Sequence, residues 1–234
     1  MVNVDTVYQR VLALANKEQR GYVTPQEFNL LANQAQLDIF EQYFYDINQF
    51  AQINDVGMEY SDAIDSLEEK MAIFETTGGI GATGILPSNL YKLGTVIWGN
   101  KEVEQIGQKK YLYINSSPLA KPKNDRPVYT RNGNVITVYG DNQITSGITC
   151  NYIKKPGGIN TLNQTADNVE WGYNVIAQKA LYNASSSMNF ELHSSEEVKL
   201  VIKILELAGI IINKPGLVSI AAQKEANKLQ QEKA

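Results

Sequence analysis

The sequence predicts an α+β protein: an α-helical bundle domain with an inserted small antiparallel β module and a C-terminal extension. Three observations predict this fold class. Apolar residues recur at helical spacing in the first third of the chain, strand and turn signals fill the middle third, and helix start signals return in the last third. We therefore expect helices in residues 1–84 and 159–213, the β module in 85–158, and a polar arm in 214–234.

Two helices are expected at the start of the chain. Val4, Val7 and Val11 fall on one stripe of a first amphipathic helix. Thr24 and Glu27 have the spacing of a capping box, which predicts a second helix over about residues 25–50. This second helix is apolar on several sides, so either the other helices or a neighbouring subunit must cover it. Its candidate interface residues are Phe28, Phe40, Phe44 and Phe50.

A third helix, 61–74, and a glycine-rich joint precede the predicted β module. Ser61 is a suitable N-cap for this helix. The glycines of residues 78–84 predict a flexible loop between helix and sheet. Residues 79–84 also match G-x-G-x-x-G, but the dinucleotide-binding motif needs a strand before it and a helix after it. We therefore expect no nucleotide site there.

The middle third predicts antiparallel strands joined by tight turns. Asn132-Gly133 lies between two alternating runs and is a strong hairpin signal, because both residue types tolerate the positive φ angles of a type I′ turn. Cys150 lies in an alternating run and is expected to be a small buried residue. The expected strands are 93–98, 101–106, 128–131, 135–139 and 148–153.

Two more helices are predicted after the β module. The pattern D-x-x-E at 167–170 predicts a helix to about Ser186, and S-x-x-E at 194–197 predicts a helix over 195–208. We expect His193 to make a hydrogen bond in the capping region of the second. The polar tail beyond it holds two further candidate partner-contact residues, Leu217 and Ile220.

The net charge of −4 hides a division along the chain. Residues 1–84 carry −9, residues 85–155 carry +6 and residues 156–234 carry −1. The basic, tyrosine-rich middle segment either pairs with acidic helices of a neighbouring subunit or forms a nucleic-acid-binding module. We favour assembly, because the acidic region of the same chain would repel phosphate. The candidate contact residues are Lys121, Lys123, Arg126 and Arg131.

The sequence offers little catalytic equipment. Its one cysteine, Cys150, and one histidine, His193, are too few for a Cys/His zinc site. A His-centred catalytic triad would have to use His193. Glu102 and Glu104 could form the carboxylate pair of a hydrolase, although alternating charge on an exposed strand is commoner. We expect no enzymatic activity, no metal and no cofactor. No secretion signal or membrane-spanning stretch is recognisable, so we expect a soluble protein made in a reducing compartment.

Several stretches together resemble structural proteins of short-tailed tailed bacteriophages, especially crAss-like and related marine phages. The opening helix and the hairpin also belong to this resemblance, which covers most of the chain. No stretch is a catalytic signature, so the resemblance depends on their combination and order. The other matching stretches are 16–29, 35–44, 117–129, 152–156 and 190–197.

The resemblance implies a head-to-tail connector, also called an adaptor or ring protein. Such proteins combine an α-helical domain with a β insertion and form a ring, expected to be dodecameric, through which DNA passes without sequence-specific binding. The implied partners are other copies of the chain, the portal protein and further tail or ring proteins, with no membrane. The implied location is the virion neck, after assembly in the host cytoplasm. By position, residues 214–234 would be the arm that grips the portal.

Overall fold

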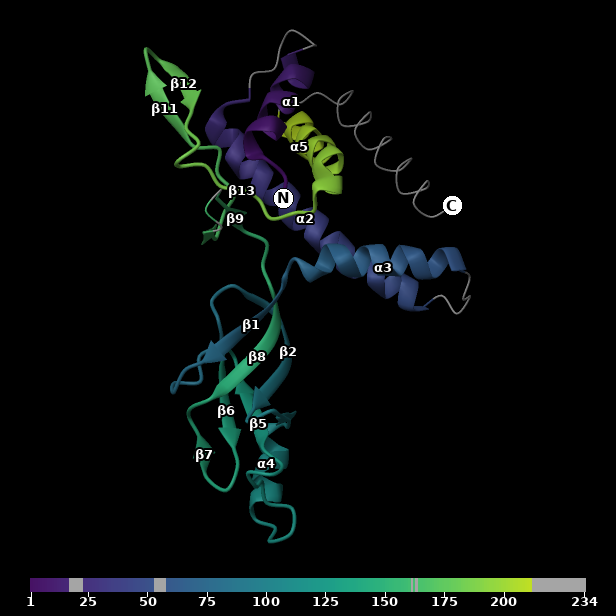
Figure 1. Ribbon diagram of the computed structural model, residues 1–234, viewed down its shortest axis with the longest axis vertical. Helices are drawn as coiled ribbons and strands as arrows, with labels where there is room; N and C mark the ends of the chain where they lie inside the picture. The colour runs from purple at the N-terminus through teal and green to yellow at the C-terminus, as the bar shows by residue number, and fades with distance from the viewer. Residues whose placement is uncertain (17–22, 53–57, 161, 163, 212–234) are drawn as a thin grey trace. The chain divides into compact units, whose positions relative to one another are not determined.

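The computed structural model describes residues 1–16, 23–52, 58–160, 162 and 164–211 (Figure 1). The chain divides into two compact units. The first unit is made of Met1–Ile73 together with Pro156–Ala234, and the second is made of Phe74–Lys155. The two connections between the units therefore lie at residues 73–74 and 155–156.

The predicted fold class, a helical bundle domain with a small β insertion, is wrong. The described residues form a mixed α/β structure with five α-helices, one short 3₁₀ helix and thirteen strands in four sheets. Five of these strands belong to the first unit, where only helices were expected. The proposed C-terminal extension, 214–234, lies outside the described residues.

Four helices of the first unit build its apolar core. They are α1 (Val4–Asn16), α2 (Pro25–Gln52), α3 (Met58–Ala72) and α5 (Glu197–Ile211). α5 packs against α1 and α2, while α3 packs against α2. The predicted stripe of α1 is confirmed, since Val4, Val7 and Val11 are fully buried. Lys70 of α3 forms an ion pair of 2.8 Å with the buried Glu196 of η1 (Ser194–Glu196).

Local capping signals are confirmed in one case and corrected in the other. The Thr24 N–H donates to Glu27 Oε2 at 2.9 Å, and the Glu27 N–H donates to Thr24 Oγ1 at 3.3 Å, which is the reciprocal pair of a capping box. These hydrogen bonds lower the pKa of the Glu27 carboxyl. The prediction of a helix that begins at Ser195 after the N-cap Ser194 is corrected, because residues 194–196 form the 3₁₀ helix η1 and α5 begins only at Glu197. The N-cap of η1 is His193, whose Nδ1 accepts from the Ser195 N–H at 3.3 Å. The expected capping hydrogen bond of His193 is therefore confirmed.

A row of amide side chains on α2 binds three backbone segments from the C-terminal part of the first unit. Asn33 pairs with both backbone groups of Val169: Oδ1 accepts from N–H at 2.8 Å and Nδ2 donates to C=O at 2.9 Å. One turn earlier, Asn29 Oδ1 accepts from the Trp171 N–H at 2.8 Å. Gln36 donates to the Gly157 carbonyl at 2.9 Å and accepts from the backbone N–H of residue 191 at 3.1 Å. These amides bond backbone groups that take no part in the neighbouring strand pairing, such as that of Glu170 with Met188.

This row explains why the predicted helix over 167–186 does not form. The N–H and C=O groups of Val169 and Trp171 bond to α2 and so are not available for helical i→i+4 bonds. The segment instead contains the hairpin of β11 (Tyr173–Ile176) with β12 (Lys179–Tyr182), and β10 (Thr165–Ala166) lies directly before it. β10 pairs with β9 (Gly158–Ile159), which also pairs with β13 (Asn189–Phe190).

The second unit consists of two four-stranded sheets around a common apolar core. The first sheet has the order β1-β8-β2-β3 and the second β4-β5-β6-β7. The core gathers Val96, Ile136, Val138 and the fully buried Cys150, whose thiol pKa is raised by burial. The strands of the first sheet are β1 (Glu75–Ile80), β8 (Ile148–Lys154), β2 (Leu90–Trp98) and β3 (Lys101–Glu102). Those of the second are β4 (Glu104–Gln105), β5 (Val128–Asn132), β6 (Val135–Tyr139) and β7 (Gln143–Ile144).

Three features of this unit test the predicted β module. A hairpin is confirmed here, but its two-residue turn is Gly133-Asn134, because Asn132 belongs to β5 and pairs with Val135. Gly133 has φ 61° while neither Asn132 nor Asn134 has a positive φ, so the predicted type I′ turn over Asn132-Gly133 is wrong. The predicted strand 101–106 is split at the buried Val103, because β3 pairs with β2 while β4 pairs with β5. The expected loop at 78–84 is partly wrong, since residues 78–80 belong to β1 and pair with β8. The helix α4 (Gln108–Asn115) was not predicted.

The amide row gives a first prediction. Asn33→Asp should lower the free energy of unfolding by about 1–3 kcal/mol, because it removes the donor to the Val169 carbonyl and places a carboxylate beside it. Urea unfolding followed by circular dichroism measures this. Gln34→Ala, on the exposed side of α2, is the control and should change stability by less than about 0.5 kcal/mol. Equal effects of the two substitutions would contradict the role of the row.

Candidate assembly surfaces

Exposed large apolar side chains gather on two elements, one in each unit, while others, such as Leu30 and Leu162, are scattered. In the first unit the gathered side chains lie on the β11–β12 hairpin, where Val175 is 66% exposed and Ile176 60%. In the second unit they lie on α4 and the loop after it, where Leu112 is 69% exposed and Leu119 97%. Exposed apolar groups gathered on one element are a common mark of an interaction site.

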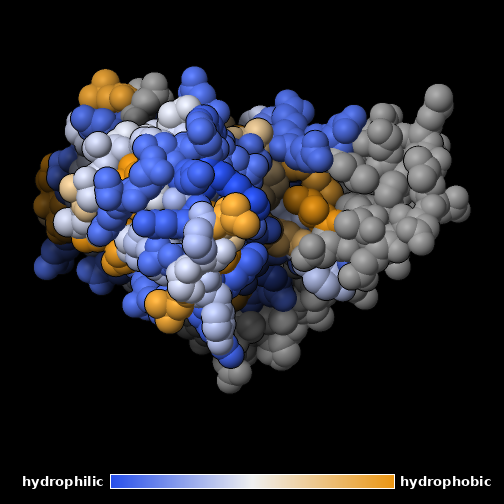
Figure 2. All heavy atoms as spheres, turned by 90° about the horizontal axis from the view of Figure 1, so that it is seen from below, coloured by the Kyte–Doolittle hydropathy of each residue, from blue (hydrophilic) through white to orange (hydrophobic). Residues whose placement is uncertain are grey.

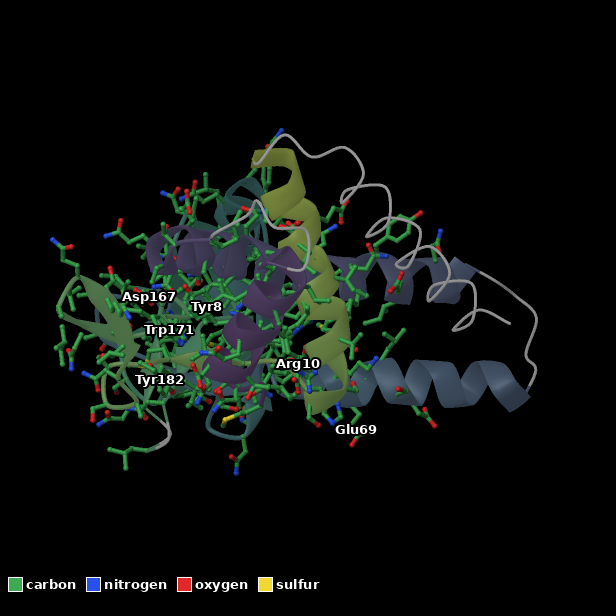
Figure 3. All side chains as sticks on the ribbon, turned by 90° about the horizontal axis from the view of Figure 1, so that it is seen from above. Tyr8, Arg10, Glu69, Asp167, Trp171 and Tyr182 are labelled. Carbon is green, nitrogen blue, oxygen red and sulfur yellow. The ribbon has the colours of Figure 1, made fainter. Side chains whose placement is uncertain are left out.

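The hairpin is fixed to the first unit by Trp171, directly before β11. The indole Nε1 donates to Asp5 Oδ1 at 2.9 Å, and the indole ring lies 4.5 Å from the Tyr8 ring by centroids. Trp171 also contacts Tyr173 and Tyr182, an opposed pair at the base of the hairpin. The ring centroids of these tyrosines lie 5.8 and 5.7 Å from that of Trp171. Figure 3 shows Tyr8, Trp171 and Tyr182 following one another from the helices toward the hairpin. The hairpin therefore starts from an ordered aromatic stack.

One face of the hairpin is apolar along its whole length. Because directly opposed residues share a face, Val175 and Ala180 lie on the same face as the tyrosine pair Tyr173 and Tyr182. The turn places Ala177 at φ 49° and Gln178 at φ 64°, left-handed conformations that cost free energy in residues other than glycine. A two-stranded hairpin is only marginally stable in water. An apolar face, a strained turn and two unpaired edges are together typical of an element that another surface covers.

We call α4 and the following loop, residues 108–126, the basic tip. Its exposed apolar residues are Leu112, Tyr113 and Leu119, and its lysines are Lys109, Lys110, Lys121 and Lys123. Tyr111 anchors α4 by stacking on Tyr139 at 4.0 Å between centroids, and burial raises the pKa of the Tyr111 phenol. Seen from the end where α4 lies in Figure 1, apolar side chains stand among hydrophilic ones (Figure 2).

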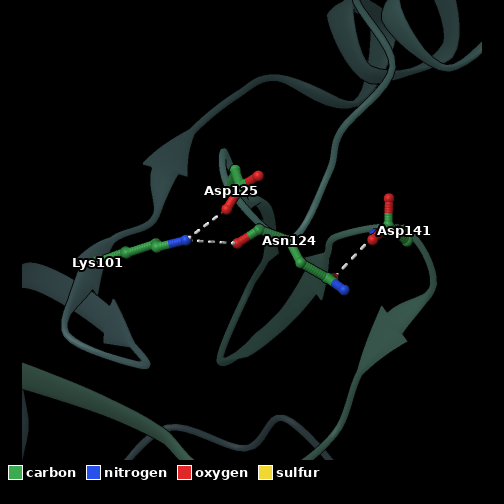
Figure 4. Close-up of polar contacts among 4 residues, drawn as sticks. All are labelled: Lys101, Asn124, Asp125 and Asp141. Atoms are coloured by element: carbon green, nitrogen blue, oxygen red, sulfur yellow. Dashed lines mark hydrogen bonds and ion pairs between the residues drawn. The ribbon is translucent and has the colours of Figure 1, made fainter.

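Polar contacts hold the base of the basic tip to the neighbouring strands (Figure 4). Lys101 Nζ lies 2.8 Å from Asp125 Oδ1 and donates to the Asn124 carbonyl at 3.4 Å. The ammonium of Lys101 lowers the pKa of the Asp125 carboxyl. Asn124 Oδ1 accepts from the Asp141 N–H at 3.1 Å. A Cβ on Gly140 would meet this oxygen at 2.3 Å, so the contact needs glycine there. The loop is thus held in one conformation while its apolar end stays exposed.

The charges of the chain separate between the two units. The second unit has 10 basic and 5 acidic side chains, and the first has 11 basic and 20 acidic ones, so their net charges are +5 and −9. Within the second unit, Arg126 and Lys110 lie 3.2 and 3.9 Å from the carboxylate of Glu104. Lys121 and Lys123 make no ion pair with any described residue, although the charge of Lys123 also lowers the pKa of the Asp125 carboxyl. Both side chains are exposed and accessible to a partner.

The sequence-predicted contact residues fall into four groups. Phe28 and Phe40 are fully buried in the first unit, so the chain itself covers these two residues. Phe44 is half-buried and lies edge-on to Phe40 at 5.1 Å. The side chain of Phe50 lies outside the described residues, as do Leu217 and Ile220. The four basic residues are exposed on the second unit: Lys121, Lys123, Arg126 and Arg131.

Sequence reasoning missed the apolar part of both surfaces. The hairpin was not predicted, because a helix was expected over 167–186. The β-branched and aromatic residues of Tyr173–Ile176 are nevertheless a strand signal. Leu112 and Leu119 gave no signal, because nothing in their local pattern distinguishes exposed from buried leucine. Only the lysines of the basic tip were recognisable from charge.

The described residues contain no cluster of three or more His, Cys, Asp and Glu side chains that could hold a metal ion. Glu102 and Glu104, the candidate carboxylate pair, lie on different strands, and Glu104 is paired with Arg126. A hollow of about 410 Å³ lies over β1, β2 and β8, lined among others by Thr77, Lys92 and Asn151. Among the helices in the described part of the chain, none is long and apolar enough to cross a membrane.

Comparison with known proteins adds no relative to this picture. No protein-family model matches the chain, and a search of curated protein sequences finds no significant match.

The aromatic stack gives the second prediction. Trp171→Ala should lower the free energy of unfolding by about 3–5 kcal/mol, because it leaves a cavity between Tyr8 and the hairpin. It should also speed hydrogen exchange in residues 173–182, measured by mass spectrometry. Trp171→Phe keeps an aromatic ring, loses the bond to Asp5, and should cost only about 1 kcal/mol. Unchanged exchange in the hairpin of Trp171→Ala would show that the hairpin does not depend on this stack.

Proposed function

We propose that this protein is a non-enzymatic structural protein of a phage virion that forms a ring, dodecameric by the resemblance, in the portal–tail connector. The observation that carries the proposal is the separation of charge between two compact units, −9 and +5. Such a chain presents opposite charges on different surfaces, so the acidic unit of one copy can meet the basic unit of the next. A contact between two different surfaces generates a ring when its rotation closes.

The two exposed apolar elements support assembly. Charge matching between subunits sets register and partner choice more than affinity. Affinity needs apolar area removed from water, and the hairpin with Val175 and the basic tip with Leu119 offer it. The family resemblance supplies the setting: the ring gives DNA a passage without sequence-specific binding and gives the portal and tail proteins a docking platform.

The second candidate function is a nucleic-acid-binding module that uses the basic, tyrosine-rich sheet. Such a module needs exposed rings on which bases stack. Tyr129 is 4% exposed and Tyr152 8%, and Tyr111 stacks on Tyr139 instead. Of the five tyrosines among these lysines, only Tyr113 is largely exposed. Assembly is therefore the better supported function.

The third prediction tests the ring itself. The purified protein, alone or after addition of the cognate portal protein, should give closed rings by negative-stain electron microscopy and the matching mass by light scattering. A protein that remains strictly monomeric and never joins a ring on the portal would overturn the proposed function.

The fourth prediction concerns the hairpin. Val175→Asp should weaken assembly by at least about tenfold in dissociation constant, because it places a carboxylate on the apolar face. Thermal unfolding of the monomer should change little, since Val175 is largely exposed. Asn174→Asp adds the same charge on the opposite face and is the matched control. Sedimentation velocity measures both, and equal weakening would mean that the apolar face is not the contact.

A further inference from the structure

We propose that the basic tip of one copy docks on the acidic helical unit of a second copy, where it meets the exposed carboxylates of α3. This inference rests on the proposed function and names the contact by which neighbouring subunits join. The tip contributes Lys121 and Lys123 together with Leu112, Tyr113 and Leu119, and none of these five side chains is buried.

The tip is arranged as a docking element. Its base is bound by Lys101, Asn124 and Asp125, and α4 is bound by the Tyr111–Tyr139 stack. Within the loop, the Lys121 N–H donates to the Ser117 carbonyl at 3.1 Å, and the Arg126 N–H donates to the Lys123 carbonyl at 3.0 Å. A loop that is ordered before it binds loses less conformational entropy on docking.

The chemistry of the tip favours a protein surface over nucleic acid. Leu119 is 97% exposed and Leu112 69%, and a phosphate backbone offers nothing for such groups to bury against. Arg126, the residue best suited to a bidentate phosphate contact, already shares Glu104 with Lys110. What remains is three lysines, Lys109, Lys121 and Lys123, beside an apolar patch, which fits an acidic protein surface.

The chain itself supplies such a surface. The first unit carries 20 acidic side chains, and α3 presents Asp65, Glu68 and Glu69 at positions i, i+3 and i+4, all exposed. No ion pair with another described residue occupies these three carboxylates. A second copy therefore brings a helix face with the negative charge that the lysines lack.

The experiment is a charge swap on the full chain. Lys121→Glu with Lys123→Glu should raise the dissociation constant of the assembly by at least about tenfold at about 50 mM salt, measured by sedimentation velocity over a concentration series. Asp65→Lys, Glu68→Lys and Glu69→Lys together should have the same effect. The chain carrying all five changes should regain assembly, because an acidic tip then meets a basic helix.

Two controls separate the contact from general effects. Lys92→Glu with Lys155→Glu makes the same charge change at the opposite end of β2 and β8, and should leave assembly within about twofold of the wild-type protein. Leu119→Ser should weaken assembly without changing thermal unfolding, because its side chain is fully exposed in the monomer.

Each outcome decides between the possibilities. Weakening by the tip and α3 variants with recovery in the combined variant supports the inference. Rings that form equally well from the tip variant overturn the inference and leave the proposed function standing. Failure of the wild-type protein to form any ring, alone or on the portal, overturns the proposed function itself. Loss of salt-sensitive DNA retention in the tip variant, with ring formation intact, assigns the tip to nucleic acid and also overturns the inference.

Discussion

The first unit depends on the side-chain amides of α2 that hold extended backbone against a helix. A helix has no free peptide groups on its side, so a strand laid along it would leave its own N–H and C=O groups unpaired. Asn29, Asn33 and Gln36 solve this because an amide carries one acceptor and one donor group, as a peptide does. Ala32 and Ala35, fully buried between them, let the extended segments come close.

The same row sets the position of both the hairpin and the connection to the second unit. Asn29 holds the backbone of Trp171, from which the hairpin begins, and Gln36 holds Gly157 just after the chain returns to the first unit. Glu191 joins this group, since its carboxylate accepts from the Gly157 N–H at 3.4 Å. The amide-rich composition, 22 Asn and 16 Gln, thus has a structural use beyond polar surface.

Features decided by neighbouring residues could be predicted from the sequence, and features decided by distant partners could not. The Thr24 capping box and the β5–β6 hairpin close within a few residues, and both are present. The D-x-x-E pattern at 167–170 resembles a helix start equally well. The backbone of this segment bonds instead to Asn33 and Asn29, which lie 136 and 142 positions away in the sequence. At the candidate surfaces, charge identified the lysines, whereas exposure of Leu112 and Leu119 follows only from the folded unit.

Apolar and charged contacts would contribute differently to the proposed assembly, and the two candidate surfaces differ in how they combine them. The hairpin face is almost uncharged, so its contribution is insensitive to salt and grows with buried area. The basic tip combines lysines with leucines, so its electrostatic part weakens as ionic strength rises while its apolar part does not. In the proposed assembly, such a subunit would associate selectively through charge and remain associated through apolar burial. The net charge of −4 is therefore less informative about the proposed contacts than the +5 and −9 of the two units.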